Sequence, residues 1–113
     1  GFDFNYYPSF APIGDVFIAE FGSEAPTTTG GKPASSVGHR VSRIDVHLGK
    51  ITTFARNKTG VAPSETNGGG FERPIDVVFG PDGEMYIVDF GIFPPKSKPI
   101  TDRCYLACDK KVT

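Results

Sequence analysis

The segment HRVSRIDVH carries residue types that a proton-transfer site needs. His39 and His47 are eight residues apart, and Arg43 and Asp45 lie between them on the same side of an alternating strand. A histidine base beside an arginine and a carboxylate could serve proton abstraction. The alternative is an outer strand that shows its polar side chains to water, and the alternation favours this second interpretation.

Two carboxylates occupy equivalent positions in a repeated stretch of the chain, each at the expected end of a strand. Glu20 closes DVFIAE and Asp89 closes EMYIVD. Together with loop carbonyls, such carboxylates could bind calcium, which takes oxygen ligands. Capping the strand end, or accepting hydrogen bonds from loop amides, is the alternative that the sequence favours.

One motif indicates covalent modification. Asn57-Lys58-Thr59 is an intact N-glycosylation sequon in a loop just after a predicted strand. In a chain exported from a cell that makes N-glycans, Asn57 is the expected site. The threonine-rich stretch 27–29 is a weaker candidate for O-linked sugar, and sequons also arise by chance.

The two cysteines, Cys104 and Cys108, are separated by three residues. As a disulfide they would close a very small loop, which adds less stability than a long-range crosslink. Free thiols are the alternative, because no second Cys or His pair nearby completes a zinc site. A disulfide would fit an extracellular or periplasmic setting.

Charge and composition exclude several classes of function. The net charge of −1 gives no general attraction to nucleic acid or to an anionic membrane, and the basic residues around 96–98 are expected in a solvated tail. No apolar run approaches the roughly 20 residues of a membrane-spanning helix. The glycine-rich stretches 30–32 and 67–70 do not match a phosphate-binding loop.

A thirteen-residue stretch occurs twice and predicts the elements that hold these residues. FAPIGDVFIAEFG, residues 10–22, returns 69 residues later as FGPDGEMYIVDFG, residues 79–91, with six identical positions. Each copy has a Pro-x-Gly turn followed by a short β-rich strand, and FDF at 2–4 or IDVVF at 75–79 precedes it. Each repeat is therefore predicted to be a β-hairpin whose second strand is buried on both faces.

The intervening segments complete the prediction. A polar loop spans 22–36, an exposed hairpin that turns at Gly49 follows, and another loop covers 57–70. The tail offers one possible strand around Cys104–Ala107, and no helix is expected. The resulting single module consists of a blade-like unit 1–56, a loop 57–70, a second hairpin 71–91 and a tail 92–113.

We therefore expect an all-β fold of antiparallel, propeller-type blades, about one and a half in number. Four antiparallel strands that run from buried to edge-exposed are typical of one propeller blade. A closed propeller needs about four or more blades of roughly forty residues each. The chain is too short to close one, so the expected product is an incomplete propeller.

The segments FERPIDVVFGPDGEMYIVDFG and VGHRVSRIDVHLGKITTFARNKTG resemble the sorbosone and glucose dehydrogenase-like β-propellers and, more loosely, NHL-type repeats. That family uses pyrroloquinoline quinone and calcium to oxidise sugars. The resemblance covers about residues 10–100 and rests on scaffold motifs, so no catalytic residue of the family carries over. The tail TDRCYLACDKKVT departs from the family pattern, which would place a closing apolar strand there.

Two functions follow from this combination. The first is a non-catalytic β module that acts by assembly or surface binding, without a cofactor of its own. Its partners would be further copies of itself or missing blades, with carbohydrate as a further candidate. The second is a fragment of a quinone-dependent sugar dehydrogenase whose active site needs other blades. An exposed apolar sheet face and an unpaired edge would favour association in either case.

Overall fold

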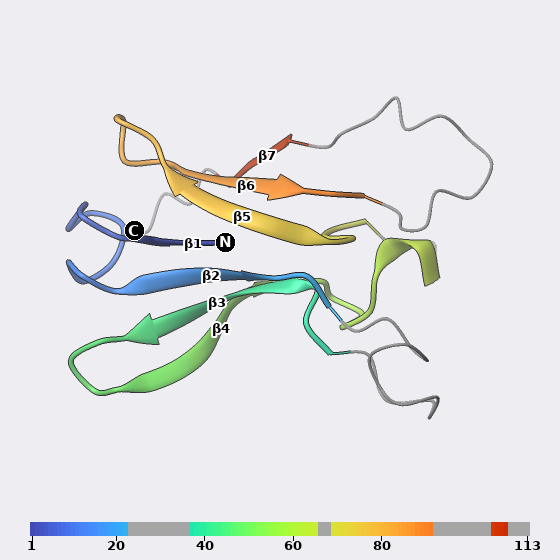
Figure 1. Cartoon of the computed structure of the whole chain (residues 1–113), viewed down its shortest axis with the longest axis horizontal. Coiled ribbons are helices and arrows are strands. Elements are labelled where there is room, and N and C mark those ends of the chain that lie inside the picture. Colours follow the sequence, from blue (N-terminus) through green and yellow to red (C-terminus); the bar gives the residue numbers. More distant parts are fainter. Residues whose placement is uncertain (23–36, 66–68, 92–104, 109–113) are drawn as a thin grey trace.

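The computed structural model describes residues 1–22, 37–65, 69–91 and 105–108, and for Glu65 and 105–108 the backbone alone. It is all-β and consists of two antiparallel sheets, with strand orders β1-β2-β3-β4 and β5-β6-β7 (Figure 1). The strands are β1 (Phe2–Phe4), β2 (Val16–Glu20), β3 (Arg40–Asp45), β4 (Lys50–Arg56), β5 (Pro74–Phe79), β6 (Met85–Asp89) and β7 (Tyr105–Cys108).

The predicted repeat hairpins are both present. β1 pairs with β2 and β5 pairs with β6. Each turn contains a glycine in the left-handed region, Gly14 at φ 93° and Gly83 at φ 83°. A residue with a Cβ is strained at such angles, so glycine favours the turn at both positions.

The loops that join these strand pairs differ in length. The β5–β6 turn is short, and Gly83 N donates to Gly80 O at 3.0 Å. The β1–β2 loop spans 5–15 and is held by the fully buried Asn5, whose Nδ2 donates to the Ala11 carbonyl at 2.7 Å. Because this loop is longer, the sequence alignment and the structure match different residues to Phe79. In the sequence, Phe79 aligns with Phe10. In the structure, Phe4 pairs with Val16 as Phe79 pairs with Met85, so Phe4 is the structural equivalent.

The second predicted hairpin is also present. β3 and β4 pair antiparallel and are joined by a turn in which Gly49 has a φ of 63°. The pairing is irregular between Val41 and Ser42, because Ser42 pairs with Thr53 and Val41 with Ala55. A bulge of this kind places an extra residue, Phe54, in β4 and increases the local twist.

The two sheets pack face to face, and aromatic side chains fill the space between them. Phe17 lies at the centre with no exposed surface, and its ring is 5.5 Å from Phe79, 5.6 Å from Phe10 and 4.9 Å from Phe54. The edge strands β1 and β5 lie side by side and run in the same direction (Figure 1). The Phe79 N–H bonds to the Asp3 carboxylate at 2.9 Å, which ties the two edges together. The buried apolar residues of this core are Phe10, Phe17, Ala19, Val41, Phe71, Val77, Met85 and Ile87.

The tail contributes a strand, β7, which pairs with β6. This lies within one residue of the predicted position around Cys104–Ala107, although the tail sequence fits a closing strand poorly. The one helical element of the described ranges is a 3-10 turn, Pro63–Glu65. Within those same ranges, no helix has the length and apolar character needed to cross a membrane.

One expectation about the repeats is wrong for this chain. Their second strands were expected to be buried on both faces, but β2 and β6 each bury one face against the other sheet. Tyr86 in β6 is 41% exposed, and Phe2, which pairs with β2, is 61% exposed. The second face of each hairpin faces away from the other sheet, and the described residues of this chain leave it open.

Candidate functional site

The two histidines proposed for proton transfer do not converge, although Arg43 and Asp45 form an ion pair at 3.6 Å. His39 precedes β3 and His47 follows it, so a six-residue strand about 17 Å long lies between them. Neither histidine belongs to the alternating strand that was predicted to align them with Arg43. The structure therefore places His39 before the start of β3, and Asp45, with its contacts to Arg43 and to the His47 N–H, at the other end of the strand.

His39 is a buried structural residue. It is 2% exposed, has a φ of 53°, and lies against Gly22, where a Cβ would come within 2.4 Å of the imidazole ring. Its Nδ1 is 2.7 Å from the Glu72 carbonyl oxygen. Because a carbonyl oxygen can only accept, Nδ1 is the protonated nitrogen and donates this bond. His39 thus ties the start of β3 to the start of β5.

Arg43 forms the main buried ion pair. Its Nη2 and Nε are each 2.5 Å from Asp15 Oδ2, and Asp15 has no exposed surface. A second carboxylate, Asp45, lies 3.6 Å from Nη2. The sequence analysis missed Asp15, although its position at the end of the repeated turn, where Glu84 stands in the second copy, was a usable signal.

The two candidate metal ligands bind protein donors. Glu20 accepts from Arg40 Nε at 3.0 Å and from the Ser42 hydroxyl. Asp89 is buried and accepts from the backbone N–H groups of Glu72, Arg73 and Gly91 at 2.8–2.9 Å. Among the residues with a described placement, no group of three or more His, Cys, Asp or Glu is arranged for a metal ion.

Asn57, the asparagine of the predicted sequon, is buried inside the fold. Its side chain is 4% exposed, and Nδ2 donates to the carbonyls of Val61 at 2.9 Å and Phe71 at 2.7 Å. Oδ1 accepts from Phe71 N at 2.6 Å. Both amide hydrogens are used inside the fold, so an N-glycan on Asn57 is incompatible with this packing. Asn57 instead anchors the loop that links the two sheets.

The remaining modification candidates are not located. Residues 27–29 and Cys104 lie outside the described residues, and for Cys108 the description covers the backbone in β7 alone.

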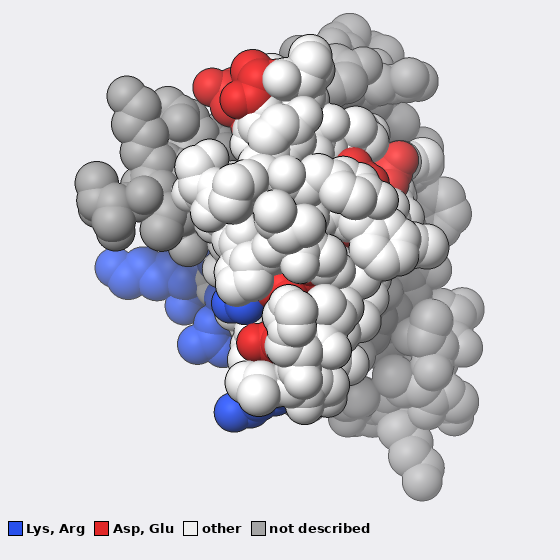
Figure 2. All heavy atoms as spheres, turned by 90° about the vertical axis from the view of Figure 1, so that its left-hand side faces the viewer, with Lys and Arg blue, Asp and Glu red and all other residues white. Residues whose placement is uncertain are grey.

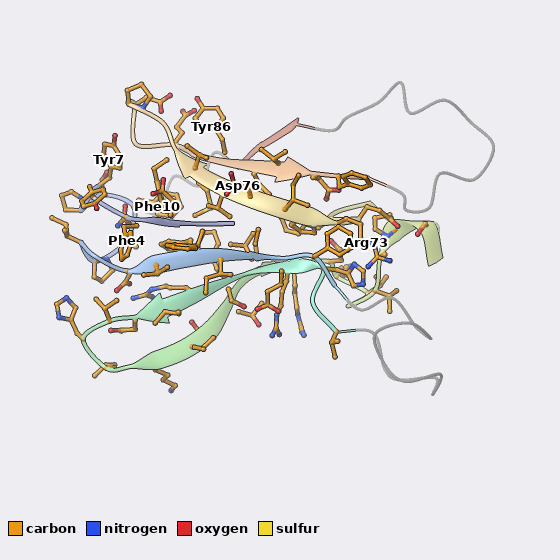
Figure 3. All side chains as sticks on the ribbon, viewed as in Figure 1. Phe4, Tyr7, Phe10, Arg73, Asp76 and Tyr86 are labelled. Atoms are coloured by element: carbon orange, nitrogen blue, oxygen red, sulfur yellow. The ribbon has the colours of Figure 1, made fainter. Side chains whose placement is uncertain are left out.

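A polar cluster closes the end of the molecule opposite the hairpin turns. Figure 3 shows Arg73 at that end, away from Tyr7 and Phe10. Its guanidinium lies 5.0 Å from the Phe21 ring centroid, and Phe21 also packs on Phe90, its own counterpart in the repeat, at 6.3 Å. Hydrogen bonds and ring contacts within the chain hold this cluster together, so we interpret it as a structural contact that joins the two sheets.

The described surface contains a groove and a smaller pocket. A groove of about 460 Å³ is formed by the loop 8–12 with Phe17, Arg43 and Phe54. A smaller hollow of about 150 Å³ lies among Val37, Gly38, His39, Arg40, Arg56 and Gly60. Arg43 and Arg40 are both engaged in ion pairs with carboxylates of this chain.

The outer face of the first sheet carries exposed apolar side chains. Cross-strand pairing places Phe4, Val16, Ile44 and Ile51 in one apolar row across all four strands. Phe4 is 41% exposed and Ile51 is 64% exposed. We call the part contributed by the first hairpin the β1–β2 open face; its residues are Phe2, Phe4, Val16 and Ile18.

The outer face of the second sheet is also apolar. Val78 and Tyr86 pair across β5 and β6 and are 45% and 41% exposed. Figure 3 shows Tyr86 on the side of β6 away from the first sheet. Its hydroxyl donates to Asp82 Oδ2 at 3.2 Å, and this bond raises the pKa of Tyr86. The pKa of Asp82 is lowered mainly by the hydrogen bond from the Glu84 N–H, and also by the bond from Tyr86. We call Val78, Tyr86 and Val88 the β5–β6 open face.

The turn end of the molecule carries little charge. In Figure 2, uncharged residues cover much of this end, acidic side chains lie along its upper part, and acidic and basic side chains lie next to each other lower down. Comparison with protein-family models, curated proteins and solved structures found no match for this chain.

Proposed function

We propose that this chain is a non-catalytic, propeller-type β module that acts by assembly, with further blade-like sheets covering its two open faces. The observation that carries the proposal is an asymmetry within the repeat. Met85 and Ile87 are 0% and 2% exposed, whereas Phe2 and Phe4, on the corresponding face of the first hairpin, are 61% and 41% exposed. The same apolar face of the repeat is thus buried in the second hairpin and exposed in the first.

Two further features support the proposal. The first sheet is a four-stranded antiparallel meander, and its first strand lies beside the first strand of the next sheet, as in neighbouring propeller blades. The resemblance of the sequence to sugar dehydrogenase-like propellers points the same way. The edge strand β4 carries Lys50 and Arg56, the kind of charged residue that discourages unspecific edge pairing.

The energetics of covering these faces are favourable. Full burial of one large apolar side chain contributes about 1.5–3 kcal/mol. Several such side chains are partly exposed on each face, and their burial opposes the loss of translational and rotational freedom on association. The polar residues that could have served catalysis, such as His39 and Arg43, bind other parts of the same chain, which supports a role without chemistry.

The test of assembly is a concentration series by sedimentation velocity, with binding of an apolar dye as a second readout. We expect association that rises with concentration and dye binding that falls as association proceeds. A monodisperse monomer at every concentration, with no dye bound, would refute the proposal.

The test of the non-catalytic part supplies pyrroloquinoline quinone, calcium and an aldose together with a dye acceptor. We expect no turnover above the protein-free mixture. Turnover by this chain, abolished when the quinone is omitted, would replace the proposal with the dehydrogenase interpretation.

A further inference from the structure

The contact between the two sheets has a direction. The first hairpin presents Phe17 and Ala19 to the second sheet, and the second hairpin presents Met85 and Ile87 to the first. In the repeat, Phe17 corresponds to Tyr86, whereas Met85 corresponds to Val16. The two hairpins therefore meet through different faces, and the contact is head to tail.

This direction leaves the complementary pair of faces open. Tyr86 and Val88, the counterparts of Phe17 and Ala19, lie on the β5–β6 open face. The β1–β2 open face carries Val16 and Ile18, the counterparts of Met85 and Ile87. Each open face thus carries the strand counterparts of one side of the internal contact, except that Val78 stands where Asp3 accepts from the Phe79 N–H.

We propose that a second copy of this chain packs its β1–β2 open face onto the β5–β6 open face of the first, and so repeats the internal contact between molecules. This inference rests on the proposed function and specifies its partner. A second copy is favoured over an unrelated protein because both halves of the contact are already present in the chain.

The internal contact predicts which side chains meet between copies. Phe17 and Phe79 pack edge to face with a centroid separation of 5.5 Å. Their counterparts are Tyr86 and Phe4, because Phe4 pairs with Val16 as Phe79 pairs with Met85. Tyr86 of one copy is therefore expected to pack against Phe4 of the next in a similar geometry.

The contact between copies is expected to be weaker than the internal one. Inside the chain, Phe10 from the long β1–β2 loop adds a ring 5.0 Å from Phe79. The short β5–β6 turn supplies no equivalent ring, and Tyr86 brings a hydroxyl where Phe17 has none. The internal contact also has the advantage of a covalent linker, which raises the effective concentration of its two halves.

The symmetry of the assembly follows from the direction of the contact. A head-to-tail contact uses two different surfaces, so every added copy presents both open faces again. Such assemblies form a ring where the rotation closes and a fibre where it does not. A contact that uses the same face on both copies would stop at the dimer.

Complementation between two variants tests the proposal. Phe4→Asp places a charge on the β1–β2 open face, and Tyr86→Asp places one on the β5–β6 open face. We expect each variant alone to sediment as a monomer of 12.2 kDa. An equimolar mixture is expected to form a species of twice that mass and no larger one, because each partner retains one intact face.

Further variants keep the test decisive. Phe2→Asp and Val78→Lys address the same two faces at more exposed positions, 61% and 45%, in case the first pair perturbs folding. Leu48→Asp is the control: Leu48 lies in the β3–β4 turn, is 76% exposed, and should leave association unchanged.

Two results would overturn the inference. One is an equimolar mixture that remains monomeric while the wild-type chain associates. The other is a Tyr86→Asp variant that dimerises as strongly as wild type, which indicates a contact through one face only. Both results leave the proposed function standing, whereas a wild-type chain that stays monomeric at every concentration and binds no apolar dye removes the proposed function as well.

Discussion

The first and second hairpins share a thirteen-residue pattern but bury opposite faces. In the first hairpin, Phe17 is completely buried, and its counterpart Tyr86 is 41% exposed. In the second, Met85 is completely buried, and its counterpart Val16 lies on the outer face. The comparison shows that both faces of the repeated strand are apolar enough to be buried. Which face is buried depends on where the other sheet lies relative to the hairpin.

The loops of the two hairpins extend this contrast. The long β1–β2 loop brings Phe10 into the core and buries Asp15 beside Arg43. In the short β5–β6 turn, the counterpart Glu84 bonds to the Tyr86 hydroxyl at the surface. Equivalent positions in the repeat are therefore expected to contribute differently to the free energy of unfolding. Substitutions at matched positions measure this difference.

The largest difference is expected between Phe17 and Tyr86. Phe17→Ala removes a ring that contacts three other core phenylalanines, and the resulting cavity should lower the free energy of unfolding by about 3–5 kcal/mol. Tyr86→Ala should lower it by less than about 1 kcal/mol in the monomer. Urea denaturation of both variants at a concentration where association is absent measures the difference, and equal losses would contradict the asymmetry.

The second comparison concerns the buried ion pair. Arg43→Ala leaves the fully buried Asp15 carboxylate without its main partner and should cost about 3 kcal/mol of unfolding free energy. Glu84→Gln, at the matching position of the second hairpin, should be nearly neutral. Thermal unfolding of the two variants side by side provides the measurement, and an Arg43→Ala protein as stable as wild type would contradict the prediction.

The loop that joins the two sheets gives the third prediction. Asn57→Asp removes both amide donors, which bond to Val61 and Phe71 carbonyls, and should destabilise the fold by about 1–3 kcal/mol. Thr59→Ala is the matched control: it destroys the same glycosylation sequon and keeps both Asn57 donors, and it removes only the exposed bonds between Thr59 Oγ1 and Val61, so its cost should be smaller. Intact mass of wild-type protein from a glycosylating host should show no glycan, and a glycan on folded protein would contradict the buried position.

The smallest effect is expected at the β3–β4 turn. Hydrogen bonds from the Leu48 and His47 N–H groups lower the pKa of Asp45 below its ordinary value of 3.8. The stabilisation is therefore present above pH 3.8 and is lost as the pH falls through the lower pKa of the folded state. Asp45→Asn should reduce the melting temperature slightly at pH 6, and the difference should vanish in stronger acid. An NMR titration that finds the Asp45 pKa at or above 3.8 would contradict the contact.

Much of the strand pattern could be predicted from local sequence. The turns follow from glycines with positive φ at 14, 49 and 83, and the alternating or apolar runs between them predict the strands. The all-β class, the three hairpins and the strand in the tail were predicted correctly on this basis. The bulge at Ser42 and the eleven-residue loop 5–15 were not, because they depend on pairing with distant strands.

The candidate sites were less predictable. Asn57 matches a glycosylation motif as a sequence, but its amide is buried by contacts with Phe71, fourteen residues away. His39 and His47 are close in sequence, but a strand between them keeps them apart. Motifs describe short segments, whereas burial and convergence arise from segments that meet only in the folded chain.

Local residue preferences therefore suffice for the strands, the turns and the apolar character of each face, since a dihedral angle or a two-residue alternation is a property of neighbouring residues. Which face is covered depends on the other sheet. Phe17 is buried and Tyr86 is exposed because packing is a contact between distant segments. The second sheet covers the Phe17 face of the first hairpin, whereas the first sheet covers the opposite face of the second hairpin, which carries Met85 and Ile87.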